Sequence, residues 1–431
     1  SRKRGEPLRV VYDSTMPKLL LKQVLSKLDL DKLDIVLAGG RYHNHKDLMK
    51  FPDCGRKDLK YPAWNPILKS ELAGDESILK LIRQSDRFIH VPYHSFDSYI
   101  RVLQEAAVNK EVKAIKTTLY RLAKDSKVIK ALIGAARNGK KVTVVIELLA
   151  RFDEASNIGW SKKMQDAGIH VIFGVEGLKV HSKITHITMK SGNDIACIST
   201  GNFHAGNARM YTDYMLMTAS RPIVREVNAV FSFIERPYSP VRFKELLVSP
   251  NEMKNKFVKL INDEIRNKEA GKPAYIKVKI NHITDPVIVS KLYEAARSGV
   301  PVELLVRGNC SLYPDLHDLN GNMKVVGIID RYLEHSRIFI FAAGGEEKIF
   351  IGSADWMPRN LDNRIEVVTP IYDPAIKEDL KRVVQFGLDD TKQGRIVDGY
   401  GTNESNTLAD GSVFRSQEEL YKLYFEKDSK C

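Results

Sequence analysis

The sequence contains an internal repeat, and this repeat limits the folds that the chain can adopt. Residues 135–147 (AARNGKKVTVVIE) match residues 295–307 (AARSGVPVELLVR) at an offset of 160. Each copy has the pattern of a helix end, a glycine turn and an apolar strand, the unit from which helix-covered parallel sheets are built. A fixed offset between two such units indicates a duplicated arrangement. The repeat therefore predicts an α/β fold with two homologous lobes.

Hydrophobic periodicity extends this pattern through most of the chain. In the first lobe the expected strands are 87–91, 112–120, 142–149, 169–173, 181–189, 195–199 and 214–218, and the expected helices are 96–107, 126–137, 160–167 and 223–233. In the second lobe the expected strands are 274–280, 302–307, 335–341, 348–352 and 364–369, and the expected helices are 254–267, 287–297 and 374–388.

Composition shifts divide the chain into four expected segments. They are 1–67, with a strand at 8–12, a helix at 18–28 and a Pro/Lys/Gly-rich connector; 68–248, the first lobe; 249–393, the second lobe; and 394–431, a polar tail. Proline-rich residues 236–250 mark the break between the lobes. The tail is expected to be flexible up to a short helix near 417–425.

A histidine is followed two residues later by a cation in each half of the chain. The pairs are His181 with Lys183 and His335 with Arg337, 154 residues apart. Residues i and i+2 of a strand share a face, so each imidazole is expected to project beside its cation. One imidazole can attack phosphorus while the other protonates the leaving oxygen, and cations stabilise phosphoryl charge. Lobes paired face to face would bring both histidines into one cleft.

A glycine-headed turn and then a carboxylate strand follow each histidine. The turns are 200–203 and 352–355, and the carboxylates are Asp213 and Glu366. A carboxylate on a neighbouring strand can hold an imidazole in its reactive tautomer. The alternative is an ordinary ion pair at a sheet edge.

Net charge and cysteine content narrow the functional classes. The chain has 67 Lys and Arg against 54 Asp and Glu, a net charge of +13. Such a balance indicates an anionic partner or a basic, solvated surface, and charge alone does not choose between them. The four cysteines form no Cys-x-x-Cys pair, which argues against a zinc knuckle and fits a reducing cytoplasm. No apolar run approaches the roughly 18 residues of a membrane span.

The duplicated motif resembles the phospholipase D superfamily, and longer stretches resemble the bacterial polyphosphate kinase family within it. These stretches are Gly39–Asn44, Tyr120–Ser126, Ala150–Glu154, Gly201–Phe203, Ala208–Tyr214, Val306–Gly308, Arg331–His335 and Ser353–Met357. Hydrolytic members carry an aspartate five residues after the lysine, where this chain has Thr188 and Ala342, which favours the kinase branch. The resemblance implies two phospholipase D-like α/β/α domains, preceded by the end of a head domain.

The resemblance also implies an activity: reversible transfer of the γ-phosphate of ATP to inorganic polyphosphate through a phosphohistidine. His181 matches the phosphorylated histidine, and His335 matches a second histidine at the nucleotide, a general acid/base. Tyr211 and Arg307 match ATP-contacting positions.

Two further arginines, Arg121 and Arg151, match positions assigned to a Mg²⁺–phosphate site. Arginine has no lone pair for a metal, and Mg²⁺ prefers oxygen ligands and commonly binds substrate phosphates. We therefore expect both guanidiniums to clamp phosphate beside a phosphate-bound Mg²⁺.

The expected partners are ATP or ADP and polyphosphate rather than nucleic acid. Lys183, Arg209, Arg337 and Arg359 are candidates for the path of the polyphosphate chain. The resemblance implies a cytoplasmic homo-oligomer that can associate with the inner face of the plasma membrane. Two other functions remain open from the sequence: a phospholipase D-type phosphodiesterase or phosphatidyltransferase, and a non-catalytic polyanion-binding protein.

Overall fold

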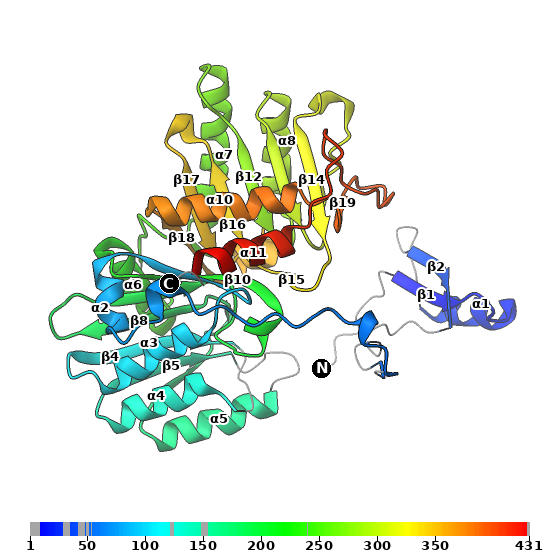
Figure 1. Ribbon diagram of the computed structural model, residues 1–431. Coiled ribbons are helices and arrows are strands. Elements are labelled where there is room, and N and C mark those ends of the chain that lie inside the picture. Colours follow the sequence, from blue (N-terminus) through cyan, green and yellow to red (C-terminus); the bar gives the residue numbers. More distant parts are fainter. Residues whose placement is uncertain are drawn as a thin grey trace. The chain divides into compact units, whose positions relative to one another are not determined.

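The computed structural model describes residues 9–28, 35–41, 48, 51–52, 54–120, 125–147, 154–238 and 240–428. The chain divides into two units, Ser1–Ala63 and Trp64–Cys431. In the first unit, β1 (Arg9–Asp13) and β2 (Ile35–Gly39) pair in parallel, and α1 (Lys18–Lys27) lies between them in sequence. Figure 1 shows both units coloured along the sequence.

The first lobe of the second unit is a mixed sheet covered by helices on both faces. Its strand order is β6-β5-β4-β8-β9-β10, with β3 also paired to β10. The strands are β3 (Arg87–Val91), β4 (Val112–Leu119), β5 (Lys141–Ile146), β6 (His170–Phe173), β8 (Ile184–Met189), β9 (Ile195–Ser199) and β10 (Tyr211–Thr218). The helices are α2 (Ile78–Gln84), α3 (Asp97–Val108), α4 (Lys127–Arg137), α5 (Glu154–Asp166) and α6 (Arg221–Glu235).

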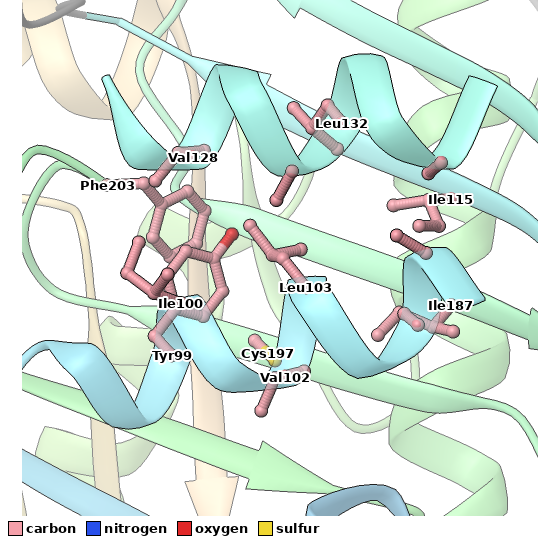
Figure 2. Packing of buried hydrophobic residues seen from close by; sticks show 14 of the residues in the cluster. Tyr99, Ile100, Val102, Leu103, Ile115, Val128, Leu132, Ile187, Cys197 and Phe203 are labelled. Carbon is pink, nitrogen blue, oxygen red and sulfur yellow. The ribbon is translucent and has the colours of Figure 1, made fainter. Parts of the chain in front are cut away.

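Alternating side chains of the strands build a core on each face of this sheet. On β9, Ile195 and Cys197 pack with α3 and α4, whereas Ala196 and Ile198 pack with α6. This alternation follows from the two-residue period of a strand. Figure 2 shows the core between α3 and α4, where Leu103 and Leu132 meet strand residues.

The second lobe repeats the arrangement. Its strand order is β14-β13-β12-β16-β17-β18, with β19 and β11 added at the two edges. The strands are β11 (Leu247–Ser249), β12 (Ile276–Ile280), β13 (Val302–Val306), β14 (Met323–Ile328), β16 (Ile338–Phe341), β17 (Lys348–Gly352), β18 (Arg364–Ile371) and β19 (Gly394–Ile396). The helices are α7 (Met253–Glu269), α8 (Pro286–Arg297), α9 (Pro358–Asp362), α10 (Pro374–Leu388) and α11 (Ser416–Asp428). The matching strand orders confirm the prediction of two homologous α/β lobes.

Two very short strands cross between the lobes. β7 (Lys179–Val180), which precedes His181, pairs in parallel with β18 of the second lobe. β15 (Leu333–Glu334), which precedes His335, pairs in parallel with β10 of the first lobe. Each histidine is therefore held against the sheet of the opposite lobe.

The structure corrects two sequence expectations near the site. The strands predicted at 181–189 and 335–341 begin only at Ile184 and Ile338, so each His-x-cation segment is a break between a short and a long strand. The tail predicted to be flexible is folded: β19 pairs with β14, and Asn406 Nδ2 donates to Leu388 O and Asp390 O, each at 2.9 Å. Among the described residues, no helix has the length and apolar character needed to cross a membrane.

Candidate active site

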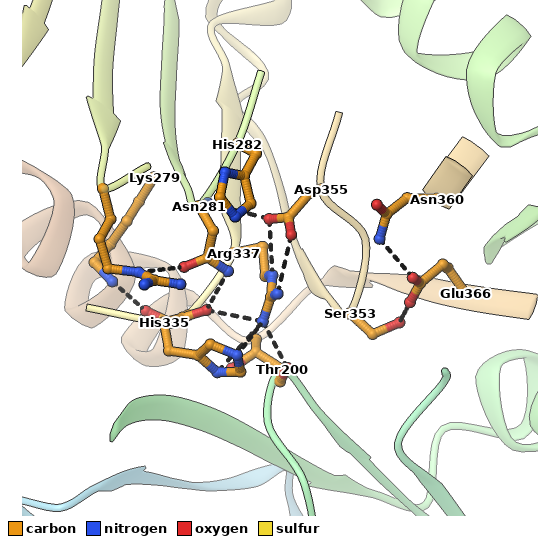
Figure 3. A network of polar contacts seen from close by, with 12 residues as sticks. Thr200, Lys279, Asn281, His282, His335, Arg337, Ser353, Asp355, Asn360 and Glu366 are labelled. Carbon is orange, nitrogen blue, oxygen red and sulfur yellow. Dashed lines mark hydrogen bonds and ion pairs between the residues drawn. The ribbon is translucent and has the colours of Figure 1, made fainter. Parts of the chain in front are cut away.

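His181 is held by a carboxylate from the other lobe. Its Nδ1 lies 2.8 Å from Glu366 Oε1 and 2.9 Å from Glu366 Oε2. Glu366 is fully buried on β18, where Ser353 Oγ donates to it at 2.5 Å and Asn360 Nδ2 at 2.7 Å (Figure 3). Because a carboxylate only accepts hydrogen bonds, Nδ1 must carry the proton. The Nε2 lone pair of His181 is then free to act as a nucleophile.

Burial keeps the His181 imidazole neutral. Desolvation lowers the pKa of His181 to about 3, and the opposing effect of Glu366 does not overcome it. Burial alone would raise the pKa of Glu366, but contact with His181, Lys183 and Ser353 lowers it. A neutral imidazole beside an ionised carboxylate is the pair that nucleophilic attack requires.

His335 has the reciprocal arrangement. Its Nδ1 lies 2.8 Å from Asp213 Oδ1 and 2.9 Å from Asp213 Oδ2, and Asp213 belongs to β10 of the first lobe. Thr200 Oγ1 donates to Asp213 Oδ1 at 2.6 Å, as Ser353 does to Glu366. Burial lowers the pKa of His335 to about 4, although Asp213 opposes the shift. The Nδ1 proton is again directed to the carboxylate, and Nε2 faces Arg337 Nη1 at 3.2 Å.

The backbone at Gly201 passes close to Asp213, and the lack of a side chain there leaves room for the carboxylate. A Cβ at Gly201 would lie 1.9 Å from Asp213 Oδ2, far inside van der Waals contact. Residue 201 therefore has to be glycine if Asp213 is to reach His335.

Arg337 lies beside the imidazole of His335, as expected, whereas Lys183 folds back on the main chain of its own segment. Lys183 Nζ donates to His181 O, and the Lys183 side chain is buried. Arg337 Nη1 donates to His335 O at 2.9 Å and to Thr200 O at 3.1 Å. The cations thus fix the backbone around each histidine and place positive charge in the seam between the lobes.

The electrostatic surroundings of the two cations differ. Arg337 Nε and Nη2 lie 3.2 Å from the two oxygens of Asp355 (Figure 3). Burial lowers the pKa of Arg337, but Asp355 outweighs it, so the net shift is upward. Burial lowers the pKa of Lys183 to about 7, against the attraction of Glu366.

Two family models match most of the chain. Polyphosphate kinase C-terminal domain 1 matches residues 77–240, and Polyphosphate kinase C-terminal domain 2 matches residues 246–417. The chain belongs to the polyphosphate kinase family.

Full-length relatives and a solved structure agree with this membership. The polyphosphate kinase of Escherichia coli K12 is 43% identical over 423 residues, which is 97% of this chain and 61% of the relative. That of Vibrio parahaemolyticus is 41% identical over 418 residues, covering 96% and 60%. The crystal structure of polyphosphate kinase from Porphyromonas gingivalis matches with a TM-score of 0.86 and 37% identity, covering 98% of this chain and 65% of that one. The chain thus spans about 60% of the length of these curated relatives.

A more distant structure shows the wider fold. Phosphatidylserine synthase of Haemophilus influenzae matches with a TM-score of 0.52 and 14% identity, over 81% of this chain and 94% of that one. At this identity the likeness concerns the fold alone, and it agrees with two phospholipase D-like domains.

Two residues that the polyphosphate kinase resemblance placed at ATP lie on the His335 side of the seam. The Tyr211 ring is 5.2 Å from the His335 ring. Arg307 Nε donates to Asn281 Oδ1 at 3.0 Å, and Asn281 Nδ2 donates to His335 O at 3.3 Å. Burial first, and then the nearby Arg337, lowers the pKa of Arg307.

The polyphosphate kinase residues expected at the Mg²⁺–phosphate site, Arg121 and Arg151, fall outside the described residues. Within the described part of the chain, no group of three or more His, Cys, Asp or Glu side chains could hold a metal ion. Arg209 and Arg359, expected along the polyphosphate path, are exposed.

Several residues that shape this polyphosphate kinase site were missed from the sequence. They are Thr200, Asn281, Ser353, Asp355 and Asn360. A signal existed for two of them, because Thr200 and Ser353 each stand 13 residues before a carboxylate. The predicted turns, 200–203 and 352–355, set Thr200 opposite Gly352, whereas the structure makes Thr200 equivalent to Ser353.

Proposed function

We propose that this chain carries the catalytic site of a polyphosphate kinase, which transfers the γ-phosphate of ATP reversibly to the end of a polyphosphate chain through a phosphohistidine at His181. The observation that carries the proposal is the neutral His181 imidazole, whose Nδ1 proton is committed to buried Glu366 and whose Nε2 is free. His335 has the same arrangement with Asp213, which supports its role as the second group of the reaction.

In the first step, His181 Nε2 attacks the γ-phosphorus of ATP. The Nε2–P bond forms, the bond between phosphorus and the bridging oxygen breaks, and ADP leaves with the electron pair. Glu366 accepts a hydrogen bond from Nδ1–H and so stabilises the positive charge that develops on the ring. His335, once protonated on Nε2, donates that proton to the bridging oxygen and takes it back in the reverse direction, and Arg307 and Tyr211 contact the nucleotide.

In the second step, a terminal oxygen of polyphosphate attacks the phosphohistidine. The P–Nε2 bond breaks, and its electron pair returns to the ring of His181. Lys183 and Arg337 stabilise negative charge on the phosphoryl oxygens. Mg²⁺ carried on the phosphates would supply further charge neutralisation, with Arg121 and Arg151 as phosphate clamps. The overall transfer breaks a phosphoanhydride bond in ATP and forms an equally stable phosphoanhydride bond in polyphosphate, so it is reversible.

The test is phosphorylation of the chain with γ-labelled ATP and, separately, with labelled polyphosphate. Phosphohistidine is labile to acid and stable to base, so we expect a label of that kind that His181→Ala removes. His170→Ala is the matched control, because His170 is an exposed histidine of the same lobe. The polyphosphate arm reports on His181 without requiring nucleotide binding. Equal labelling of parent and His181→Ala would refute the phosphohistidine role.

The same experiment separates the two alternatives. Release of diester products without polyphosphate synthesis would indicate a phosphodiesterase or phosphatidyltransferase. Salt-sensitive polyanion binding that survives both His181→Ala and His335→Ala, with no turnover, would indicate a binding protein.

Assembly and location follow only from family resemblance. We propose a cytoplasmic homo-oligomer with peripheral association to anionic membrane, supported by the net charge of +13. Sedimentation velocity measures the first property, and co-sedimentation with phosphatidylglycerol vesicles measures the second. A monomer that leaves the vesicles unbound at low salt would contradict both.

A further inference from the structure

The C-terminal helix α11 lies where the two lobes meet and bonds to both of them (Figure 1). The Tyr424 hydroxyl donates to Asp379 Oδ2 of α10 at 2.8 Å and lies 3.1 Å from His90 Nδ1 of β3. Asp428 Oδ1 accepts from Ser70 N at 3.0 Å. The helix therefore spans the first lobe and the second and is part of the folded unit.

The first turn of α11 is hydrogen-bonded to the segment that precedes His335. Gln417 is fully buried, and its Oε1 accepts from Tyr332 N at 2.9 Å. Its Nε2 donates to Tyr332 O at 2.9 Å and to Glu334 Oε1 at 2.7 Å. One side-chain amide thus satisfies both main-chain groups of Tyr332 and a carboxylate next to the histidine.

From Glu334 the network continues to the histidine itself. Glu334 Oε2 accepts from Thr212 Oγ1 at 2.9 Å and lies 2.8 Å from Lys279 Nζ. Thr212 Oγ1 in turn accepts from His335 N at 3.1 Å. A continuous path of hydrogen bonds joins the amide of Gln417 to the backbone of His335.

Among the described residues of the first lobe, no buried side-chain amide is hydrogen-bonded to the segment before His181. The residue before His181 is Val180, which packs in an apolar cluster with Ile184 and Ile365. The residue before His335 is a buried carboxylate, which needs partners because a buried charge without them is costly. Position 334 therefore depends on polar contacts, and α11 supplies one of them through Gln417.

We propose that Gln417 is a positioning residue for His335, and that α11 holds the second histidine, but not the first, in its reactive orientation. Gln417 acts through Glu334 and Thr212 and touches neither substrate nor the reacting atoms. The kinetic consequence rests on the proposed function, whereas the orientation of His335 does not.

The decisive variant is Gln417→Leu, which keeps the approximate volume and removes the three hydrogen bonds. We expect kcat for polyphosphate synthesis to fall by about tenfold to a hundredfold, with KM for ATP within about twofold. Gln385→Ala is the matched control, because Gln385 is a hydrogen-bonded glutamine of the same lobe that contacts Lys277 and Asp389. It should retain the parental kcat.

A second readout needs no substrate. Proton–nitrogen NMR of the imidazoles follows the pKa values of His181 and His335 separately. Loosening of the His335 segment admits water, so we expect the pKa of His335 to rise toward its ordinary value in Gln417→Leu while that of His181 stays unchanged. This readout stands even if the chain proves not to be a polyphosphate kinase.

Exchanging the amide and the carboxylate between positions 417 and 334 controls for loss of activity through unfolding. Gln417→Glu puts two carboxylates together at positions 417 and 334, and we expect a larger loss of kcat than in Gln417→Leu. Adding Glu334→Gln restores one amide and one carboxylate and should recover at least about a tenth of the parental kcat. The proposal is overturned if Gln417→Leu keeps both the parental kcat and the parental His335 pKa. It is also overturned if the double variant is no better than Gln417→Glu, or if the His181 and His335 pKa values shift together.

Discussion

The two lobes use the same plan around their histidines but differ in the charge that accompanies each one. In the second lobe Arg337 is paired with Asp355. The position equivalent to Asp355 in the first lobe is Asn202, whose buried Oδ1 has no hydrogen-bond partner among the described residues. Lys183, the counterpart of Arg337, therefore lacks a carboxylate from its own turn.

The two halves of the duplicated site are therefore unequal in the counter-charges around their cations. A paired arginine stays charged at every ordinary pH, while a buried lysine with fewer counter-charges titrates near neutrality. Arg337 thus keeps its charge at every ordinary pH, whereas the charge of Lys183 responds to pH. Five experiments test this contrast.

The largest effect is expected from neutralising the carboxylates, one lobe at a time. Glu366→Gln should act on His181, and Asp213→Asn on His335, although each carboxylate belongs to the opposite lobe. Each variant replaces a carboxylate, which only accepts, by an amide whose NH2 group can donate to Nδ1 and favour the wrong tautomer, so we expect kcat to fall by about 10²- to 10⁴-fold. NMR of the imidazole nitrogens assigns each effect to one histidine. A Glu366→Gln variant that perturbs His335 alone would refute the crossed pairing.

The next effect should come from the glycine that makes room for Asp213. Gly201→Ala places a methyl group 1.9 Å from Asp213 Oδ2, so the carboxylate must move away from His335. We expect a loss of kcat of about tenfold or more, measured with ATP and polyphosphate. Ala354→Gly is the control at the equivalent turn, where a Cβ is already accommodated. Parental kinetics in Gly201→Ala would contradict the close approach.

A smaller effect is expected in the pH profile, where the two cations differ. Free-enzyme kcat/KM should decline as pH rises through about 7, because Lys183 loses its charge there. Lys183→Arg should remove the decline. The parental decline should persist in Arg337→Lys, although its plateau will be lower. A parental profile that is flat from pH 6 to 9 would contradict the assignment.

The same shift affects stability with a definite sign. The folded pKa of Lys183, about 7, lies below its unfolded value, so the unfolded chain binds more protons between about 7 and 10.5. The free energy of unfolding attributable to Lys183 therefore rises with pH in this window. Urea titrations at pH 7 and 9, compared between parent and Lys183→Arg, measure the difference.

The smallest effect is expected from the hydroxyls that support the carboxylates. Ser353→Ala and Thr200→Val each remove one donor to a buried carboxylate. A hydrogen bond to a charged group contributes about 1.5–3 kcal/mol, so we expect a loss of this size in the free energy of unfolding. Glu366 keeps Asn360 as a second donor, so Ser353→Ala should cost less than Thr200→Val. Chemical denaturation provides the comparison.

Much of the lobe architecture could be predicted from the sequence, because periodicity and caps are local. The strands Ile195–Ser199 and Lys348–Gly352 and the helix Pro374–Leu388 occur at the predicted residues. The helix is signalled by Asp373, whose carboxylate accepts from Ala375 N and Ile376 N, followed by a proline.

The crossed pairing could not be predicted, because it depends on strands too short to show a period. β7 and β15 have two residues each, and they pair each histidine segment with the opposite sheet. The prediction of a flexible tail was wrong for a related reason. Polar composition at 401–407 indicated solvent, yet Asn406 is fully buried and caps the end of α10.

Reciprocal contact between equivalent residues is the geometry of a twofold dimer, in which residue i of one subunit meets residue j of the other and the reverse. A dimer of identical lobes would have to place the same side chain at both equivalent positions. Joining the lobes in one chain removes that constraint, because equivalent positions can then differ. They differ here at Lys183 and Arg337, at Asn202 and Asp355, and at Val180 and Glu334. The pseudo-symmetric seam thus lets one polypeptide give two copies of one motif different surroundings.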